Sequence, residues 1–168
     1  MLQLAMGVIP RLPRRAIVSL SRLMGGLGYH CSARTRRMGL ANLDVVFGET
    51  KTPEEKVRIL RTSLNNFALV MLDLLWFSRK TEARLTRWFT ASESFRQSLD
   101  IQVPRVGVTG HFGNWEMTGR QWGRGSGGIM SVAMPLKNPR VDDLLQRMRE
   151  KNGQIVVERK GALRKLVK

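Results

Sequence analysis

The second half of the chain alternates between strand-like and helix-like segments, and this alternation constrains the fold more than any other feature. A helix is predicted near residues 114–122, and Asn138-Pro139 caps and starts a second helix that runs to about Lys151. Apolar, β-branched runs predict strands at 103–109, 129–133 and 154–158. Alternation of this kind favours an α/β fold, in which helices pack on a parallel sheet.

The first half of the chain is expected to be helical. Its clearest helix begins after Thr52, where Thr-Pro-Glu-Glu supplies an N-cap, a proline at the first helical position and a glutamate three residues after the cap. Apolar residues at helical spacing extend this helix to about Trp76. Residues 14–28 also follow helical spacing, and such a helix either packs on the core or lies on an anionic membrane. Residues 30–50 are expected to be irregular to partly helical.

The net charge of 29 − 13 = +16 indicates an anionic partner: nucleic acid, anionic lipid or an acidic carrier protein. Nucleic acid is not expected, because the chain has no nucleic-acid motif and its aromatic residues are not interleaved with its basic runs. The single cysteine, Cys31, excludes an internal disulfide and a cysteine-based zinc site. With only two histidines, far apart in sequence, no metal site is expected. No run reaches the roughly 18 apolar residues that span a bilayer.

The residues with the most specific chemistry lie in the run 107–119. His111 can accept a proton from a hydroxyl, and the carboxylate of Glu116, bonded to the other ring nitrogen, would fix the tautomer. We expect His111 to stand where a strand ends, a common place for reactive groups in α/β folds. A purely structural interpretation stays open, in which His111 is a surface residue and Trp115 is core. His30 has basic neighbours and no acidic one, so it is expected to be structural.

Residues 111–116, His-Phe-Gly-Asn-Trp-Glu, resemble the signature of the bacterial lipid A biosynthesis acyltransferases, the lauroyl and myristoyl transferases. Two further blocks, 135–140 and 159–162, follow at family-like spacing. Upstream segments also resemble the N-terminal region of the family: Leu12-Pro13, 25–29, Arg36-Arg37, Asn42-Leu43 and 52–55. The resemblance therefore covers nearly the whole chain.

The resemblance implies an N-terminal, membrane-associating helical region over residues 1–100. Residues 101–168 would then be the first half of an αβα glycerolipid-acyltransferase-like domain with a mostly parallel sheet. The chain is expected to be a fragment, because family members continue for roughly another hundred residues, in line with ordinary domain sizes.

The family transfers a fatty acyl chain from acyl carrier protein, or in some branches coenzyme A, to a glycolipid hydroxyl. The resemblance thus implies acyl carrier protein, a glycolipid acceptor and an anionic inner-membrane surface as partners. It places the protein at the cytoplasmic face of the inner membrane, either peripheral or anchored at its N-terminus. No cofactor is expected beyond the acyl donor, acyl-ACP or acyl-CoA.

Carried onto this chain, the resemblance makes His111 the general base for the acceptor hydroxyl and Glu116 the carboxylate that orients it. The hydroxyl would attack the thioester directly, in agreement with the absence of an activated Ser or Cys beside His111. Backbone N–H groups at Gly113 and Asn114 are expected to stabilise an oxyanion or a phosphate. The residues expected to hold phosphates, with solvated surface charge as the alternative, are Lys137, Arg140, Arg159 and Lys160.

Other functions stay open on the sequence alone. The same pair of residues would serve acyl transfer to another glycolipid, such as a phosphatidylinositol mannoside. The chain would also fit an inactive fragment, or a basic protein that binds membranes without catalysis.

Overall fold

The structure is a computed structural model that describes residues 2–101, 103, 106–125 and 127–166. It divides into two compact units, Met1–Trp88 and Phe89–Lys168, each with its own packing. The division falls ahead of residue 100, the boundary that the sequence favours, because helix α6 (Glu93–Asp100) packs against α7 (Trp115–Gly125) within the second unit.

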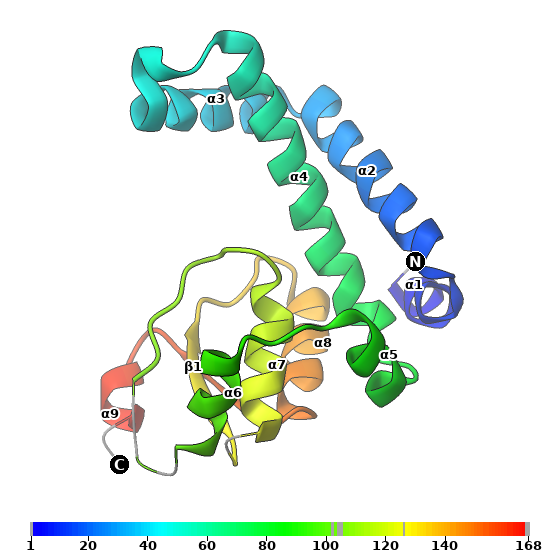
Figure 1. Cartoon of the computed structure of the whole chain (residues 1–168), viewed down its shortest axis with the longest axis vertical. Helices are drawn as coiled ribbons and strands as arrows, with labels where there is room; N and C mark the ends of the chain where they lie inside the picture. The colour runs from blue at the N-terminus through cyan, green and yellow to red at the C-terminus, as the bar shows by residue number, and fades with distance from the viewer. Residues whose placement is uncertain (1, 102, 104–105, 126, 167–168) are drawn as a thin grey trace. The chain divides into compact units, whose positions relative to one another are not determined.

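The first unit is entirely helical (Figure 1). Its two long helices, α2 and α4, pack side by side, and α3 crosses the pair at one end. Its elements are α1 (Leu2–Val8), η1 (Ile9–Arg11), α2 (Arg14–Cys31), α3 (Ala33–Phe47), η2 (Gly48–Thr50), α4 (Pro53–Trp76) and α5 (Thr81–Trp88). The segment 30–50 is therefore more helical than its sequence indicates, because Ser32 caps α3 by accepting a hydrogen bond from Thr35 N at 3.2 Å.

Close backbone contacts hold α2 against α4. Ile17 is fully buried, and Gly25 lies so near α4 that a Cβ atom there would meet the Asn65 backbone nitrogen at 2.6 Å. One face of α2 thus packs on the core, as the core-packing interpretation of residues 14–28 requires. Leu23 and Leu27 on this helix remain exposed.

A second set of contacts ties the start of α2 to the end of α4. The carboxylate of Asp73, which is 3% exposed, binds the guanidinium of Arg14. The guanidinium groups of Arg14 and Arg84 both contact the indole of Trp76, at 5.0 and 3.9 Å from its ring centre. Its Nε1 donates to the carbonyl of Leu12 at 2.9 Å. Because cations attract aromatic faces most strongly when water is excluded, this cluster fixes the path of the N-terminal segment.

The second unit contains a small parallel sheet. Strands β1 (Ile129–Ala133) and β2 (Gln154–Glu158) pair from Ile129↔Gln154 to Ala133↔Glu158, and α8 (Pro139–Glu150) forms the crossover between them. A short helix, α9 (Ala162–Leu166), follows β2. Both strands have the bounds that the sequence predicts, and the α/β class is confirmed.

The strand expected over residues 103–109 is not formed in its described part. Residues 106–109 have no sheet pairing, and Val106 and Val108 are 91% and 94% exposed. Residues 104 and 105 lie outside the described residues. An alternating apolar run becomes a strand only where a neighbouring strand accepts its hydrogen bonds and a core covers its side chains. The sheet of the described residues accordingly has two strands rather than three.

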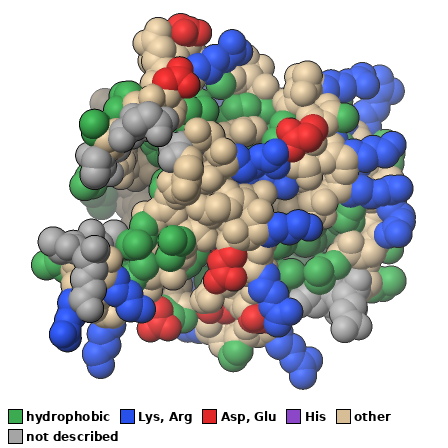
Figure 2. All heavy atoms as spheres, turned by 90° about the horizontal axis from the view of Figure 1, so that it is seen from below, with side chains coloured by type: hydrophobic (Ala, Val, Ile, Leu, Met, Phe, Trp, Pro, Cys, Tyr) green, Lys and Arg blue, Asp and Glu red, His purple; other side chains and the backbone are tan. Residues whose placement is uncertain are grey.

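Basic side chains are spread widely over the surface, as Figure 2 shows for one face of the molecule. Among the described residues, no helix combines the length and the apolar character needed to cross a membrane.

The N-terminal cap of α4 provides a test of local stability. Thr52 Oγ1 accepts from Glu55 N at 3.3 Å, and Glu55 Oε2 accepts from Thr52 N at 2.9 Å. Thr52→Ala should lower the free energy of unfolding by about 1 kcal/mol, because it leaves a helix donor without a partner. Urea denaturation measures the change, and Thr52→Ser, which keeps the hydroxyl, should remain near wild type. Equal losses in both variants would contradict the capping account.

The same cap has a pH dependence. The hydrogen bond from the Thr52 backbone lowers the pKa of Glu55 from its ordinary value. Its contribution to stability is therefore present above the ordinary carboxyl pKa and is lost as pH falls through the lowered pKa. In Glu55→Gln this part of the acid dependence should be absent.

Candidate active site

The candidate site is built on a tight turn that leads into α7. Gly113 has a φ of +59°, a left-handed conformation that strains residues with a Cβ. Asn114 caps the helix, because its Oδ1 accepts a hydrogen bond from Met117 N at 3.2 Å. The turn therefore fixes the backbone of residues 111–116 at a helix start, where N–H groups point outward.

His111 lies on this turn with its side chain exposed. Its ring contacts Trp115 edge to face, with 4.9 Å between the ring centres and 63° between the planes. Such aromatic pairs restrict the orientation of both rings. The imidazole is thus held on one side and accessible to a substrate on the other.

Glu116, in the first turn of α7, is only 5% exposed. Its carboxylate accepts from Arg149 Nη2 at 2.5 Å and from Arg149 Nε at 3.2 Å. The indole Nε1 of Trp115 donates a third hydrogen bond to Glu116 Oε1, also at 3.2 Å. The carboxylate is therefore buried with an opposite charge and three donors.

The hydrogen bond expected between Glu116 and His111 does not form between these two described residues. Glu116 instead binds Arg149, because a guanidinium offers a full charge and two donors in a planar fork. The connection from the carboxylate to His111 runs through Trp115, which bonds Glu116 and packs on the imidazole. Their roles as base and orienting carboxylate stay predictions.

Arg149 is the residue of this site that the sequence did not indicate. It lies in the last turn of α8, where basic residues are common because they complement the helix dipole. Nothing in its spacing distinguishes it from Arg147, which forms an exposed pair with Asp143 on the same helix. Arg149 reaches Glu116 because α8, the crossover between the parallel strands, packs beside α7 in the folded unit.

The packing of α7 shows which edge of the sheet the site faces. A Cβ at Gly123 would meet Asn152 O at 2.3 Å, ahead of β2, and one at Gly119 would meet the side chain of Gln154, where β2 starts. Helix α7 therefore runs opposite to β2, and its first turn points toward the end where the strands finish. Figure 1 shows the turn before α7 at this end.

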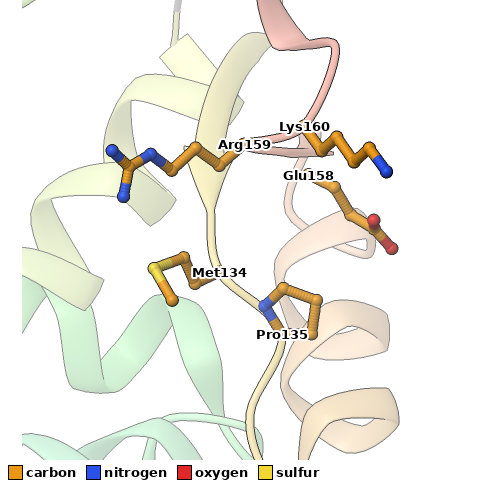
Figure 3. Close-up of a pocket in the computed structure, with 5 residues that line it drawn as sticks. All are labelled: Met134, Pro135, Glu158, Arg159 and Lys160. Atoms are coloured by element: carbon orange, nitrogen blue, oxygen red, sulfur yellow. The ribbon is translucent and has the colours of Figure 1, made fainter.

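A pocket of about 400 Å³ lies where both strands end. Parallel strands finish at the same edge, so residues after β1 and β2 meet there: Met134, Pro135, Glu158, Arg159 and Lys160. Figure 3 shows Arg159 and Lys160 extending to opposite sides of this pocket, with Glu158 on the side of Lys160. Two of the four basic residues that the sequence singles out therefore line this pocket.

The other two basic residues, Lys137 and Arg140, are exposed and do not belong to the pocket lining. His111 is also outside that lining. In the part of the chain that the structure describes, no cluster of His, Cys, Asp and Glu is suited to hold a metal ion.

Comparison with known families adds one finding. The model of the family described as bacterial lipid A biosynthesis acyltransferase matches residues 2–168. No curated protein and no solved structure matches the chain.

The Glu116–Arg149 pair predicts a large difference between two arginines on one helix. Arg149→Met should lower the free energy of unfolding by on the order of 3 kcal/mol, because it leaves a buried carboxylate without its charge partner. Arg147→Met, the matched control, should leave it nearly unchanged, because exposed pairs contribute little. Chemical denaturation measures both variants, and similar stabilities would show that the buried pair does not stabilise the unit.

Proposed function

The chain belongs to the bacterial lipid A biosynthesis acyltransferase family, and we propose that it transfers a fatty acyl chain from acyl carrier protein or acyl-CoA to a hydroxyl of a lipid A precursor. The observation that carries this proposal is the family match over residues 2–168, which includes the turn bearing His111. The accessible imidazole on a fixed backbone supports the same activity.

In the proposed reaction, His111 removes the proton of the acceptor hydroxyl as its oxygen attacks the thioester carbonyl. The tetrahedral intermediate then collapses, an ester forms, and the carbon–sulfur bond breaks. The proton on His111 passes to the departing thiolate, which restores the neutral imidazole. No acyl group becomes attached to the protein, because the acceptor oxygen is itself the nucleophile.

Glu116 is proposed to orient His111 and to stabilise its charged form. Its bond to the Trp115 indole supports an orienting role, since the same indole packs on the imidazole. Its carboxylate lies buried in the helix turn that follows His111. The guanidinium of Arg149 holds that carboxylate in place through the ion pair.

The backbone N–H groups of Gly113 and Asn114 are proposed to receive the oxyanion of the intermediate. Their place at a capped helix start supports this role, because donors fixed in advance stabilise developing charge without reorganising. Arg159 and Lys160, in the pocket where the strands end, are proposed to bind phosphates of the donor arm or of the acceptor. Lys137 and Arg140 would add positive charge near this edge.

The protein is proposed to act at the cytoplasmic face of the inner membrane, as a peripheral protein or one anchored at its N-terminus. The net charge of +16 supports binding to anionic lipid head groups and to an acidic carrier protein. Its acceptor, a glycolipid, is itself a membrane component.

Substitution of the base is the first test. His111→Ala should reduce acyl transfer at least about a hundredfold, because general base catalysis contributes about 10² to 10⁴ in rate. Product is measured by mass spectrometry of the acylated acceptor, with the longest purified form of the protein. His30→Ala, which removes a ring bonded to Arg61 in the first unit, serves as the control and should stay active. Wild-type turnover in His111→Ala would remove the proposed mechanism.

The pocket gives a second test. Arg159→Ala should raise KM for the phosphate-bearing substrate roughly tenfold, the value of one charge-assisted hydrogen bond, with a smaller change in kcat. Steady-state kinetics separates the two parameters. Arg96→Ala, an exposed arginine of α6, removes the same charge away from the pocket and should leave KM unchanged. An equal rise in both variants would point to general electrostatics rather than to binding in the pocket.

A further inference from the structure

Helix α3 differs from the other long helices of the first unit because none of its residues is buried. It rests on α4 through Gly39, where a Cβ would meet the side chain of Leu60 at 2.5 Å. Its apolar side chains are nevertheless largely open: Met38, Val45 and Val46 are 53%, 88% and 70% exposed. A helix with this much uncovered apolar surface indicates a partner outside the unit.

Met38 and Val45 lie on the face of α3 that points away from α4, whereas Val46 falls on the same side as Gly39. Positions 34, 38, 41 and 45 are spaced by four, three and four residues, which places them along one stripe of a helix. Gly39, the contact with α4, falls on the opposite side. We call the stripe of Arg34, Arg37, Met38, Ala41 and Val45 the outer face of α3.

The charge on the outer face is positive and uncompensated. Arg34 and Arg37 are exposed, and neither forms an ion pair with a described residue. The acidic residue of this helix, Asp44, is neutralised by Lys56 at 2.6 Å. The first turn of α3 has no acidic side chain, so the two arginines lie near the end where the helix dipole is also positive. An anionic partner at this end would offset both effects.

We propose that the outer face of α3 docks on an anionic lipid surface, with Met38, Ala41 and Val45 entering the interface and Arg34 and Arg37 binding lipid phosphates. This inference rests on the proposed function, which requires the protein at a membrane, and it names the element that binds there. The sequence leaves such a role open for residues 14–28, with core packing as the alternative, and one face of α2 is occupied by α4.

The size of the outer face favours lipid over protein. A helix of 15 residues is about 22 Å long, and one face about 10 Å wide offers roughly 220 Å². A stable protein interface needs about 800 Å² from each partner. An interfacial helix needs only an apolar stripe with flanking basic residues, because the lipid adapts to its shape.

Vesicle sedimentation of the full chain tests the inference. The protein should bind vesicles of equimolar phosphatidylglycerol and phosphatidylcholine, and bind vesicles of phosphatidylcholine alone far more weakly. Arg34→Glu with Arg37→Glu should weaken binding to the anionic vesicles about 30-fold or more, since each basic residue at such a surface contributes about a factor of five. Arg58→Glu with Arg96→Glu makes the same change in net charge at other exposed sites and should weaken binding only a few-fold.

The apolar contribution is tested with matched single variants. Val45→Ser should weaken binding severalfold, whereas Leu163→Ser, which removes a 76% exposed side chain from α9, should not. Insertion is observed directly with a fluorophore on a cysteine at position 41, using Ala41→Cys together with Cys31→Ser. Its emission should shift to the blue on the anionic vesicles, and a label introduced by Thr62→Cys on α4 should not respond.

Equal binding by the two double-glutamate variants would overturn the inference, as would an unshifted label at position 41. A dimer in solution that Val45→Ser dissociates would overturn it too, by assigning the face to a second copy. Acyl transfer in detergent micelles separates this inference from the proposed function. The α3 variants should remain active there, and His111→Ala should bind vesicles normally while inactive. Normal vesicle binding without any acyl transfer would remove the proposed function and leave the docking surface intact.

Discussion

The buried ion pair between Glu116 and Arg149 is the interaction on which the candidate site depends. A carboxylate that is 5% exposed requires a charge partner, and the crossover helix α8 supplies it from its last turn. The pair joins the start of α7 to the end of α8. Through the Trp115 indole it also holds the imidazole of His111. The orientation of the proposed base is thus set by tertiary packing rather than by the turn alone.

The two units divide the proposed work. The second unit carries His111 and the basic pocket where the parallel strands finish. In the first unit, α3 offers arginines and apolar side chains on one open face. A glycolipid acyltransferase must bind a lipid surface as well as activate a hydroxyl. Placing these tasks on separate elements allows each to be altered without the other.

Local signals in the sequence were sufficient for some elements and not for others. The cap at Thr52, the Asn138-Pro139 helix start and the apolar runs of β1 and β2 predicted those elements, because each depends on short-range chemistry. The prediction of a strand over 103–109 is wrong for the described residues of that segment. Sheet pairing depends on a neighbouring strand and on a core that covers the side chains. Arg149 was missed for a similar reason: its partner lies 33 positions away, and only folding brings them together.

In the proposed mechanism the acceptor hydroxyl, activated by His111, attacks the thioester directly. Intact-protein mass spectrometry during turnover, with acyl donor and a lipid A precursor, tests whether the acyl group passes through the protein. Direct attack predicts that the acceptor gains the mass of one acyl group while the protein mass stays constant, with and without acceptor. An acyl adduct on the protein that forms with donor alone and disappears on addition of acceptor would contradict it.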